Sequence, residues 1–202
     1  MTNPPPTTPH RTANGSVAPV YFERLYRAQG DPWDYRTSGY EAAKYAATLD
    51  ALPRPRYASA LEVGCSIGVF TRQLAARTDR LLALDVSDDA LACARWQCAG
   101  LRHVAFERRV LPEETPPGPF DLAVVSEVGY YLAPADLGVL LDRLAEAVEP
   151  GGHLVLVHWT GETDYPMAAD DVHSAARAHA AWRGTWCHRA DAYRLDVLER
   201  AA

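Results

Sequence analysis

The sequence predicts a single α/β domain with a mostly parallel sheet and helices on both of its faces. Three observations lead to this fold class. The chain of 202 residues has the length of one ordinary domain that buries a full core. Short apolar segments alternate with segments of helical spacing, as in wound α/β sheets. One apolar segment also runs directly into a glycine-rich turn that opens a helix.

The first fifty residues divide into a tail and two helices. Residues 1–16 are rich in Pro and Thr and lack an apolar period, so we expect a disordered tail. The domain then occupies residues 17–202. Within residues 17–29 and 39–52, aromatic and aliphatic residues recur at helical spacing. These two entry helices are expected to form a lid ahead of the sheet.

The rest of the chain predicts seven strands. Five buried parallel strands are expected at 59–64, 80–85, 103–107, 120–127 and 153–159. Helical spacing lies between them at 69–77, 88–97 and 137–148. Asp170 or Asp171 is expected to cap a last helix that reaches about Trp182. Residues 185–200 then predict two strands around a turn near Asp191, which would form a terminal antiparallel hairpin.

Composition restricts the classes of function. The formal net charge of −6 disfavours a large phosphate-binding surface, so we expect no nucleic-acid partner. The chain shows neither a secretory signal nor an apolar run long enough for a membrane, which favours a soluble, cytoplasmic protein. The four cysteines lack metal-binding spacing, and no zinc pattern is present, so we expect no metal. No feature favours a particular oligomeric state.

The most informative segment is LEVGCSIGVFT at residues 61–71. Gly64 and Gly68 let the backbone turn tightly and approach a ligand closely. Asp85 ends the next predicted strand, 21 residues after Gly64, where a carboxylate can accept both ribose hydroxyls. Together they indicate a nucleoside cofactor. Dehydrogenases share this arrangement, but their G-x-G-x-x-G fingerprint is absent, and Glu62 stands two places before the first glycine.

In this segment the chain resembles class I methyltransferases, whose first motif is E-x-G-x-G-x-G, with Ser66 at the middle glycine. The resemblance continues through ALDVS, FDLAVVSEV and PGGHLVLV. GDPWDYRTSGYEAAKY at 30–45 and SEVGYYL at 126–132 resemble the nodulation protein S group of N-methyltransferases, which methylate an amino group on a sugar oligomer. The resemblance implies a Rossmann-like class I fold and an enzyme of the EC 2.1.1 class. Its cofactor would be S-adenosylmethionine, released as S-adenosylhomocysteine.

The resemblance also implies a set of cofactor-binding residues. Those around the methionine and ribose would be Glu62, Gly64, Cys65, Gly68 and Asp85. Those beside adenine would be Val86 and Ser87, with the backbone near Val110 and Leu111 in place of an acidic residue that the family often carries there. Trp33, Arg36 and Tyr40 would close over the site from the entry helices. Glu127, at the carboxyl end of the fourth strand, would face the amino-acid part of the cofactor or the acceptor. For Trp33 and Tyr40 the alternative is helix packing, and for Arg36 it is a solvated turn.

Methyl transfer to an amine requires that the acceptor lose a proton, which a carboxylate or a neutral imidazole can receive. Glu127 and His158 are the candidate catalytic residues because both lie where parallel strands end. Their structural alternatives are orienting the cofactor and capping a strand, respectively. Tyr130 and Tyr131 are expected, with His158, to contact the acceptor, since ring faces attract cations. Core packing is the alternative for both tyrosines.

The sequence therefore predicts an enzyme that methylates a small-molecule acceptor, first of all the amine of an amino sugar or a related metabolite. An O-methyltransferase acting on a phenol or another natural-product hydroxyl is the alternative within the fold. An NAD-dependent oxidoreductase is disfavoured by the glycine spacing and the lack of a substrate domain. A binding module that keeps the cofactor pocket without turnover is the third alternative.

Overall fold

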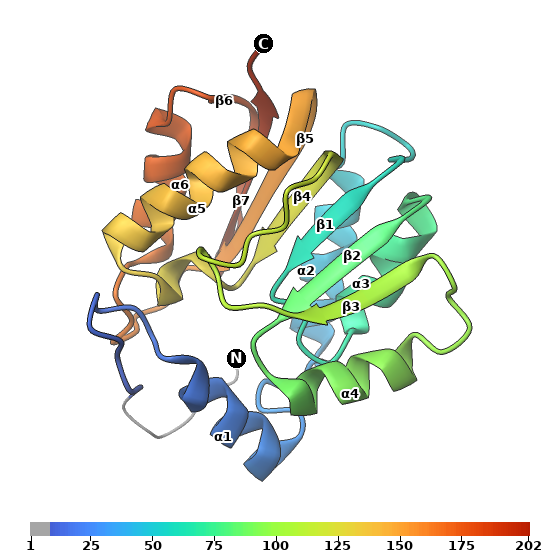
Figure 1. Cartoon of the computed structure of the whole chain (residues 1–202), viewed down its shortest axis with the longest axis vertical. Coiled ribbons are helices and arrows are strands. Elements are labelled where there is room, and N and C mark those ends of the chain that lie inside the picture. The colour runs from blue at the N-terminus through green and yellow to red at the C-terminus, as the bar shows by residue number, and fades with distance from the viewer. Residues whose placement is uncertain (1–8) are drawn as a thin grey trace.

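A computed structural model describes residues 9–202. In the described part of the chain, one seven-stranded sheet has the order β3-β2-β1-β4-β5-β7-β6 (Figure 1). The strands are β1 (Ala60–Val63), β2 (Leu81–Asp85), β3 (Val104–Arg108), β4 (Phe120–Ser126), β5 (Val148–Trp159), β6 (Trp182–Arg189) and β7 (Tyr193–Arg200). β1 to β5 pair in parallel, and β7 runs antiparallel to both β5 and β6. The predicted fold class, with its terminal hairpin, is confirmed.

Helices cover both faces of this sheet, and Figure 1 shows α5 and α6 across one of them. The helices are α1 (Pro19–Gln29), α2 (Gly39–Asp50), α3 (Val69–Leu74), α4 (Asp88–Gln97), α5 (Pro134–Ala147) and α6 (Ala169–Ala178), with short 3₁₀ turns η1 (Ala75–Arg77) and η2 (Gly129–Tyr131). None of the helices in the described region is long and apolar enough to cross a membrane.

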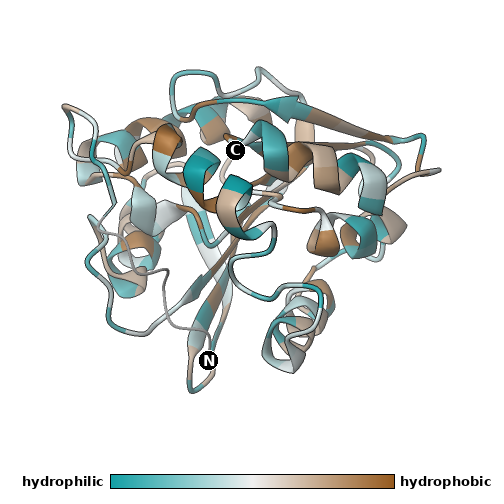
Figure 2. Cartoon of the chain, turned by 90° about the horizontal axis from the view of Figure 1, so that it is seen from below, coloured by the Kyte–Doolittle hydropathy of each residue, from teal (hydrophilic) through white to brown (hydrophobic). Residues whose placement is uncertain are grey.

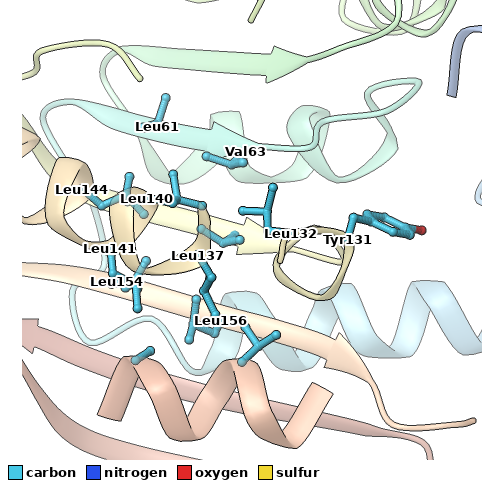
Figure 3. Packing of buried hydrophobic residues seen from close by; sticks show 14 of the residues in the cluster. Leu61, Val63, Tyr131, Leu132, Leu137, Leu140, Leu141, Leu144, Leu154 and Leu156 are labelled. Atoms are coloured by element: carbon cyan, nitrogen blue, oxygen red, sulfur yellow. The ribbon is translucent and has the colours of Figure 1, made fainter. Parts of the chain in front are cut away.

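Alternation along the strands divides the core between the two faces. Leu61 and Val63 of β1 pack with Leu137 and Leu140 of α5 (Figure 3), whereas Ala60 faces the cluster that includes α2 and α3. In Figure 2, apolar residues recur along the strands, whereas the helices alternate between apolar and polar residues. Successive side chains of a strand point to opposite faces of the sheet, so each of the two core layers receives every second residue.

The last helix differs from its prediction at both ends. Its N-cap is Ala168, so Asp170 and Asp171 lie in the first turn and do not cap it. Asp170 instead accepts hydrogen bonds from Arg189 and Arg194 of the terminal hairpin. The helix ends at Ala178 because the chain turns extended there, and Trp182 already begins β6.

Residues 9–16 do not form the mobile tail predicted for residues 1–16, of which residues 1–8 lie outside the described region. Ser16 is buried, and its hydroxyl accepts a hydrogen bond from the Ala133 amide at 2.8 Å and donates to Asp136. Val17 donates its amide to the Tyr131 carbonyl at 2.7 Å. The Ser16 hydroxyl thus accepts a hydrogen bond at the start of α5, where the N-cap residue Ala133 has no side chain that could cap the helix. Composition does not reveal a partner so distant in sequence.

Candidate active site

A cavity of about 290 Å³, here called cavity 1, lies at the carboxyl ends of β1, β2 and β4. Ligands of open α/β sheets bind at this edge, beside the point where the strand order reverses. Val63, Leu84 and Ser126 contribute from the three strands, and Phe22 and Tyr26 of α1 form the opposite wall. Its volume is near the lower end of the range for small-molecule sites.

The turn after β1 has a backbone that few residues adopt. Gly64 has φ +81°, and a Cβ there would lie 2.2 Å from Cγ2 of Val128, so only glycine fits. Ser66, at the middle glycine of the motif, has φ +50° and accepts a hydrogen bond from the Tyr26 hydroxyl at 2.6 Å. That contact fastens α1 over the turn. Gly68 does not line cavity 1. A Cβ there would lie 2.8 Å from Cα of Ala94, so this glycine permits α3 to pack on α4.

Asp85 stands at the end of β2 with its carboxylate in the wall of cavity 1. Its Oδ2 accepts from the Ser66 amide at 2.8 Å and its Oδ1 from the Ser87 amide at 3.0 Å. Burial raises the pKa of Asp85 to about 6, and these two amides oppose the rise. Each oxygen retains a second lone pair, so the carboxylate can accept from a diol without losing its supports.

Val86, Val110 and Leu111 line the same cavity beyond Asp85, together with the charged residues Arg109 and Glu113. Ser87 does not reach it, because its buried hydroxyl caps α4 by accepting from the Ala90 amide.

Besides Gly68 and Ser87, three further predicted cofactor-binding residues line neither cavity 1 nor the smaller cavity beside it. Cys65 packs its side chain with Ala83 and Leu91. Glu62 is buried, its Oε2 has no hydrogen-bond partner, and burial raises its pKa to about 8. Arg36 is partly exposed and lies 3.9 Å from Asp31. The structure thus gives no support to a direct contact of these three with the cofactor.

A second, smaller cavity of about 50 Å³, cavity 2, adjoins the first. Trp33, Tyr35, Glu127 and Tyr131 line both cavities. The other lining residues of cavity 2 are Tyr40, Glu41, Lys44, Tyr130, Trp159 and Tyr165. Trp33, Tyr40, Tyr130 and Tyr131 therefore all line this pair of adjoining cavities, and their contacts with cofactor or acceptor stay predictions.

Glu127 is held at the junction by three donors. Its carboxylate accepts from Nζ of Lys44 at 2.5 Å, from the Tyr130 hydroxyl, and from the Trp159 amide at 3.0 Å. Lys44 also donates to Glu41 at 3.0 Å. Burial favours the neutral amine of Lys44, but the charges of Glu127 and Glu41 outweigh it and raise the pKa of Lys44. The lysine is therefore a buried cation.

Sequence reasoning missed Glu41 and Lys44. Both lie on the buried side of α2, together with Tyr45 and Thr48. A lysine three residues after a glutamate on a helix usually indicates a solvent-exposed ion pair between the two side chains. The signal that distinguishes this one is its place within the buried stripe of the helix, which the spacing of Tyr45 and Thr48 reveals.

His158 is completely buried and lines neither cavity. Its Nε2 accepts from the Gly129 amide at 3.0 Å, and its Nδ1 lies 3.1 Å from Nε2 of His173. His173 in turn lies 3.2 Å from Asp196. Burial lowers the pKa of His158 well below its ordinary value. Both ring nitrogens have partners, and the side chain lines neither cavity, so the expectation that His158 contacts the acceptor is not met. The residue instead supports η2, the turn that follows Glu127.

Among the described residues, no three His, Cys, Asp or Glu side chains are grouped so that they could hold a metal ion.

The strand order, the terminal hairpin and a cavity at the ends of β1, β2 and β4 define the Rossmann-like fold of class I methyltransferases. The chain belongs to the nodulation protein S (NodS) family, whose model matches residues 22–157. The resemblance seen in the sequence is thereby confirmed.

Individual relatives agree with this assignment. Nodulation protein S of Rhizobium tropici is 35% identical over 130 residues, which cover 63% of this chain and 55% of the relative. A second relative is a dTDP-3-amino-3,6-dideoxy-alpha-D-glucopyranose N,N-dimethyltransferase of Streptomyces fradiae. It is 28% identical over a segment that covers 75% of this chain and 56% of the relative. The match spans about half the length of these relatives.

Among solved structures, the N-methyltransferase NodS of Bradyrhizobium japonicum WM9, in complex with S-adenosyl-L-homocysteine, superposes with a TM-score of 0.80 at 23% identity. That match covers 90% of this chain and 98% of that one. This structural similarity supports the assignment of the fold.

Proposed function

We propose that this chain is an S-adenosylmethionine-dependent N-methyltransferase that acts on the amine of a small acceptor, namely an amino sugar or a related metabolite. The observation that carries the proposal is the pair of adjoining cavities at the carboxyl edge of the sheet, which share Glu127 and Tyr131. Cavity 1 would hold the cofactor, and cavity 2 would receive the acceptor group.

The residues of cavity 1 fit the cofactor. Asp85 presents a carboxylate with free lone pairs, which suits the ribose hydroxyls. Gly64 lets the backbone after β1 approach the ligand. Val86, Val110 and Leu111 offer an apolar wall suited to adenine. When bound, S-adenosylmethionine supplies an electrophilic methyl group on a sulfonium.

For methyl transfer, the main tasks of the protein are to align the acceptor with the methyl donor and to exclude water. The shared wall of the two cavities is where donor and acceptor would meet. Aromatic rings of Trp33, Tyr35 and Tyr131 stand there and can attract positive charge. A tightly bonded Glu127 sets the position of this wall through Lys44 and Tyr130.

The preference for an amine over a hydroxyl rests on the family and on charge. The NodS relative of known structure is named an N-methyltransferase, and the Streptomyces relative acts on an amino sugar by its name. Cavity 2 also contains two carboxylates and one lysine, a balance that suits a cationic amine better than a neutral phenol.

A two-stage experiment tests the proposal. First, S-adenosylhomocysteine should raise the melting temperature, whereas NAD should not. Second, amino sugars, simple amines and phenols should be screened for a mass gain of one methyl group together with release of S-adenosylhomocysteine. Methylated amino sugars are expected. Methylated phenols alone would establish the O-methyltransferase alternative, and cofactor binding without any transfer would establish the binding module.

A further inference from the structure

One carboxylate oxygen in cavity 2 has no hydrogen-bond partner. Glu41 is 7% exposed, and its Oε2 is buried without a hydrogen bond. Lys44 Nζ lies 3.0 Å from both oxygens of Glu41 but makes its hydrogen bond with Oε1. An unsatisfied buried oxygen is costly, and Glu41 is one of the residues that line cavity 2. It is ready for a donor that comes from outside the protein.

The charges around the cavity are unbalanced. Glu41 and Glu127 each carry a carboxylate, and Lys44 is the one cation among the residues that line cavity 2. Burial raises the pKa of Glu41, and the ammonium of Lys44 opposes that rise. The cluster therefore has a formal charge of −1 when both carboxylates are ionised, and a second cation would neutralise it.

The remaining wall is aromatic and suits a cation. Tyr130 and Tyr165 stack with ring centroids 5.3 Å apart, and the Tyr40 ring lies 5.0 Å from Nζ of Lys44. Trp159 completes the wall at the end of β5. Such rings stabilise an ammonium through their faces while excluding water. The cavity of about 50 Å³ has room for an ammonium head group and not for a whole sugar.

We propose that cavity 2 is the binding site for the acceptor's protonated amine, and that Oε2 of Glu41 receives an N–H of that amine and then its proton. This proposal rests on the proposed function, because it assigns the acceptor site of that reaction. Glu127 is less suited to the task, since three donors already occupy its carboxylate. His158 is less suited because it lines neither cavity and because both of its ring nitrogens already have partners.

The step balances. One proton moves from the ammonium nitrogen to Oε2 of Glu41, which becomes a neutral carboxylic acid, and the nitrogen keeps the electron pair. The nitrogen then forms a bond to the methyl carbon while the electrons of the carbon–sulfur bond remain on sulfur. The methylated amine carries the positive charge, and the proton on Glu41 returns to solvent when the product leaves.

Binding of ethylammonium tests the site without requiring any methyl transfer. NMR titrations on the full chain saturated with S-adenosylhomocysteine should show saturable binding of ethylammonium and at least about tenfold weaker binding of ethanol, its neutral counterpart. Glu41→Gln should weaken ethylammonium binding about tenfold or more, because a charged acceptor is lost while the shape is kept. Glu162→Gln, which removes the same charge from an exposed loop position, should leave binding unchanged.

The outcomes separate this proposal from the proposed function. Equal binding of ethylammonium and ethanol by the wild type, or no saturable binding of ethylammonium, overturns the cation site even if the variant does not fold. Equal ethylammonium affinity in a folded Glu41→Gln protein overturns the role of Glu41. Failure of S-adenosylhomocysteine to bind the wild type overturns the proposed function instead.

Discussion

Cavity 1 and cavity 2 share a wall but are built in different ways. One wall of cavity 1 comes from short segments at strand ends, such as Gly64 after β1 and Asp85 to Val86 at β2, and α1 lies opposite them. Cavity 2 is assembled from α2, the ends of β4 and β5, and the loop that carries Tyr165. A site made of strand ends can be found from local patterns, whereas a site between distant elements depends on packing.

The largest effect should come from Glu41→Gln, which alters cavity 2 alone. With an amine acceptor found in the screen, kcat/KM should fall about 10²-fold or more at pH 7, because the proton acceptor is lost. The deficit should shrink towards pH 10 as free amine becomes abundant. Affinity for S-adenosylhomocysteine, measured by calorimetry, should stay the same. A loss of equal size at every pH would contradict proton transfer and leave only a binding role.

The matching change in cavity 1 is Asp85→Ala. S-adenosylhomocysteine should bind about 1.5 to 3 kcal/mol more weakly, the scale of hydrogen bonds to a charged group. Calorimetry measures the effect, and ethylammonium binding to the variant, once it is saturated with S-adenosylhomocysteine, should be unaffected. Unchanged cofactor affinity would remove Asp85 from the site and weaken the distinction between the two cavities.

Glu62 lies behind the glycine turn, and its substitution tests whether it acts on stability and not on binding. Its folded pKa of about 8 exceeds the ordinary 4.5, so the folded state holds an extra proton between these values. The stability of the wild type relative to Glu62→Gln should therefore be highest below about pH 4.5. It should be lost as pH rises towards 8, by at most about 1.4 kcal/mol per pH unit.

Urea denaturation of both proteins at pH 5, 6.5 and 8 measures this difference, since other groups titrate in both and cancel. Parallel curves for wild type and variant would show that Glu62 ionises normally in the folded protein.

The smallest effect on turnover is expected from His158→Gln. Because His158 lines neither cavity, kcat should change by less than about threefold and the pH profile should keep its shape. Stability should fall instead, since the Gly129 amide and His173 lose a partner. A fall of about 10²-fold in kcat at unchanged stability would return His158 to the reaction and count against Glu41.

The sequence by itself determined the order of elements and which strand ends contribute to cavity 1. Period-two and helical spacing follow from backbone geometry, so the seven strands and the helices between them could be predicted with errors mainly at their ends. Gly64 and Asp85 could be found for a related reason, since parallel strands bring their carboxyl ends to one edge. The resemblance to NodS proteins added the cofactor and the aromatic residues of the entry helices.

Only the tertiary structure decided which side chains meet across long separations. Lys44 contacts Glu127, 83 residues away, because α2 packs beside the ends of β4 and β5. The same packing leaves Oε2 of Glu41 beside Lys44 but without a hydrogen bond, and turns His158 inward to Gly129 and His173. It also seats Ser16 on the start of α5. Local spacing cannot specify such contacts, because they depend on how whole elements fill the space between them.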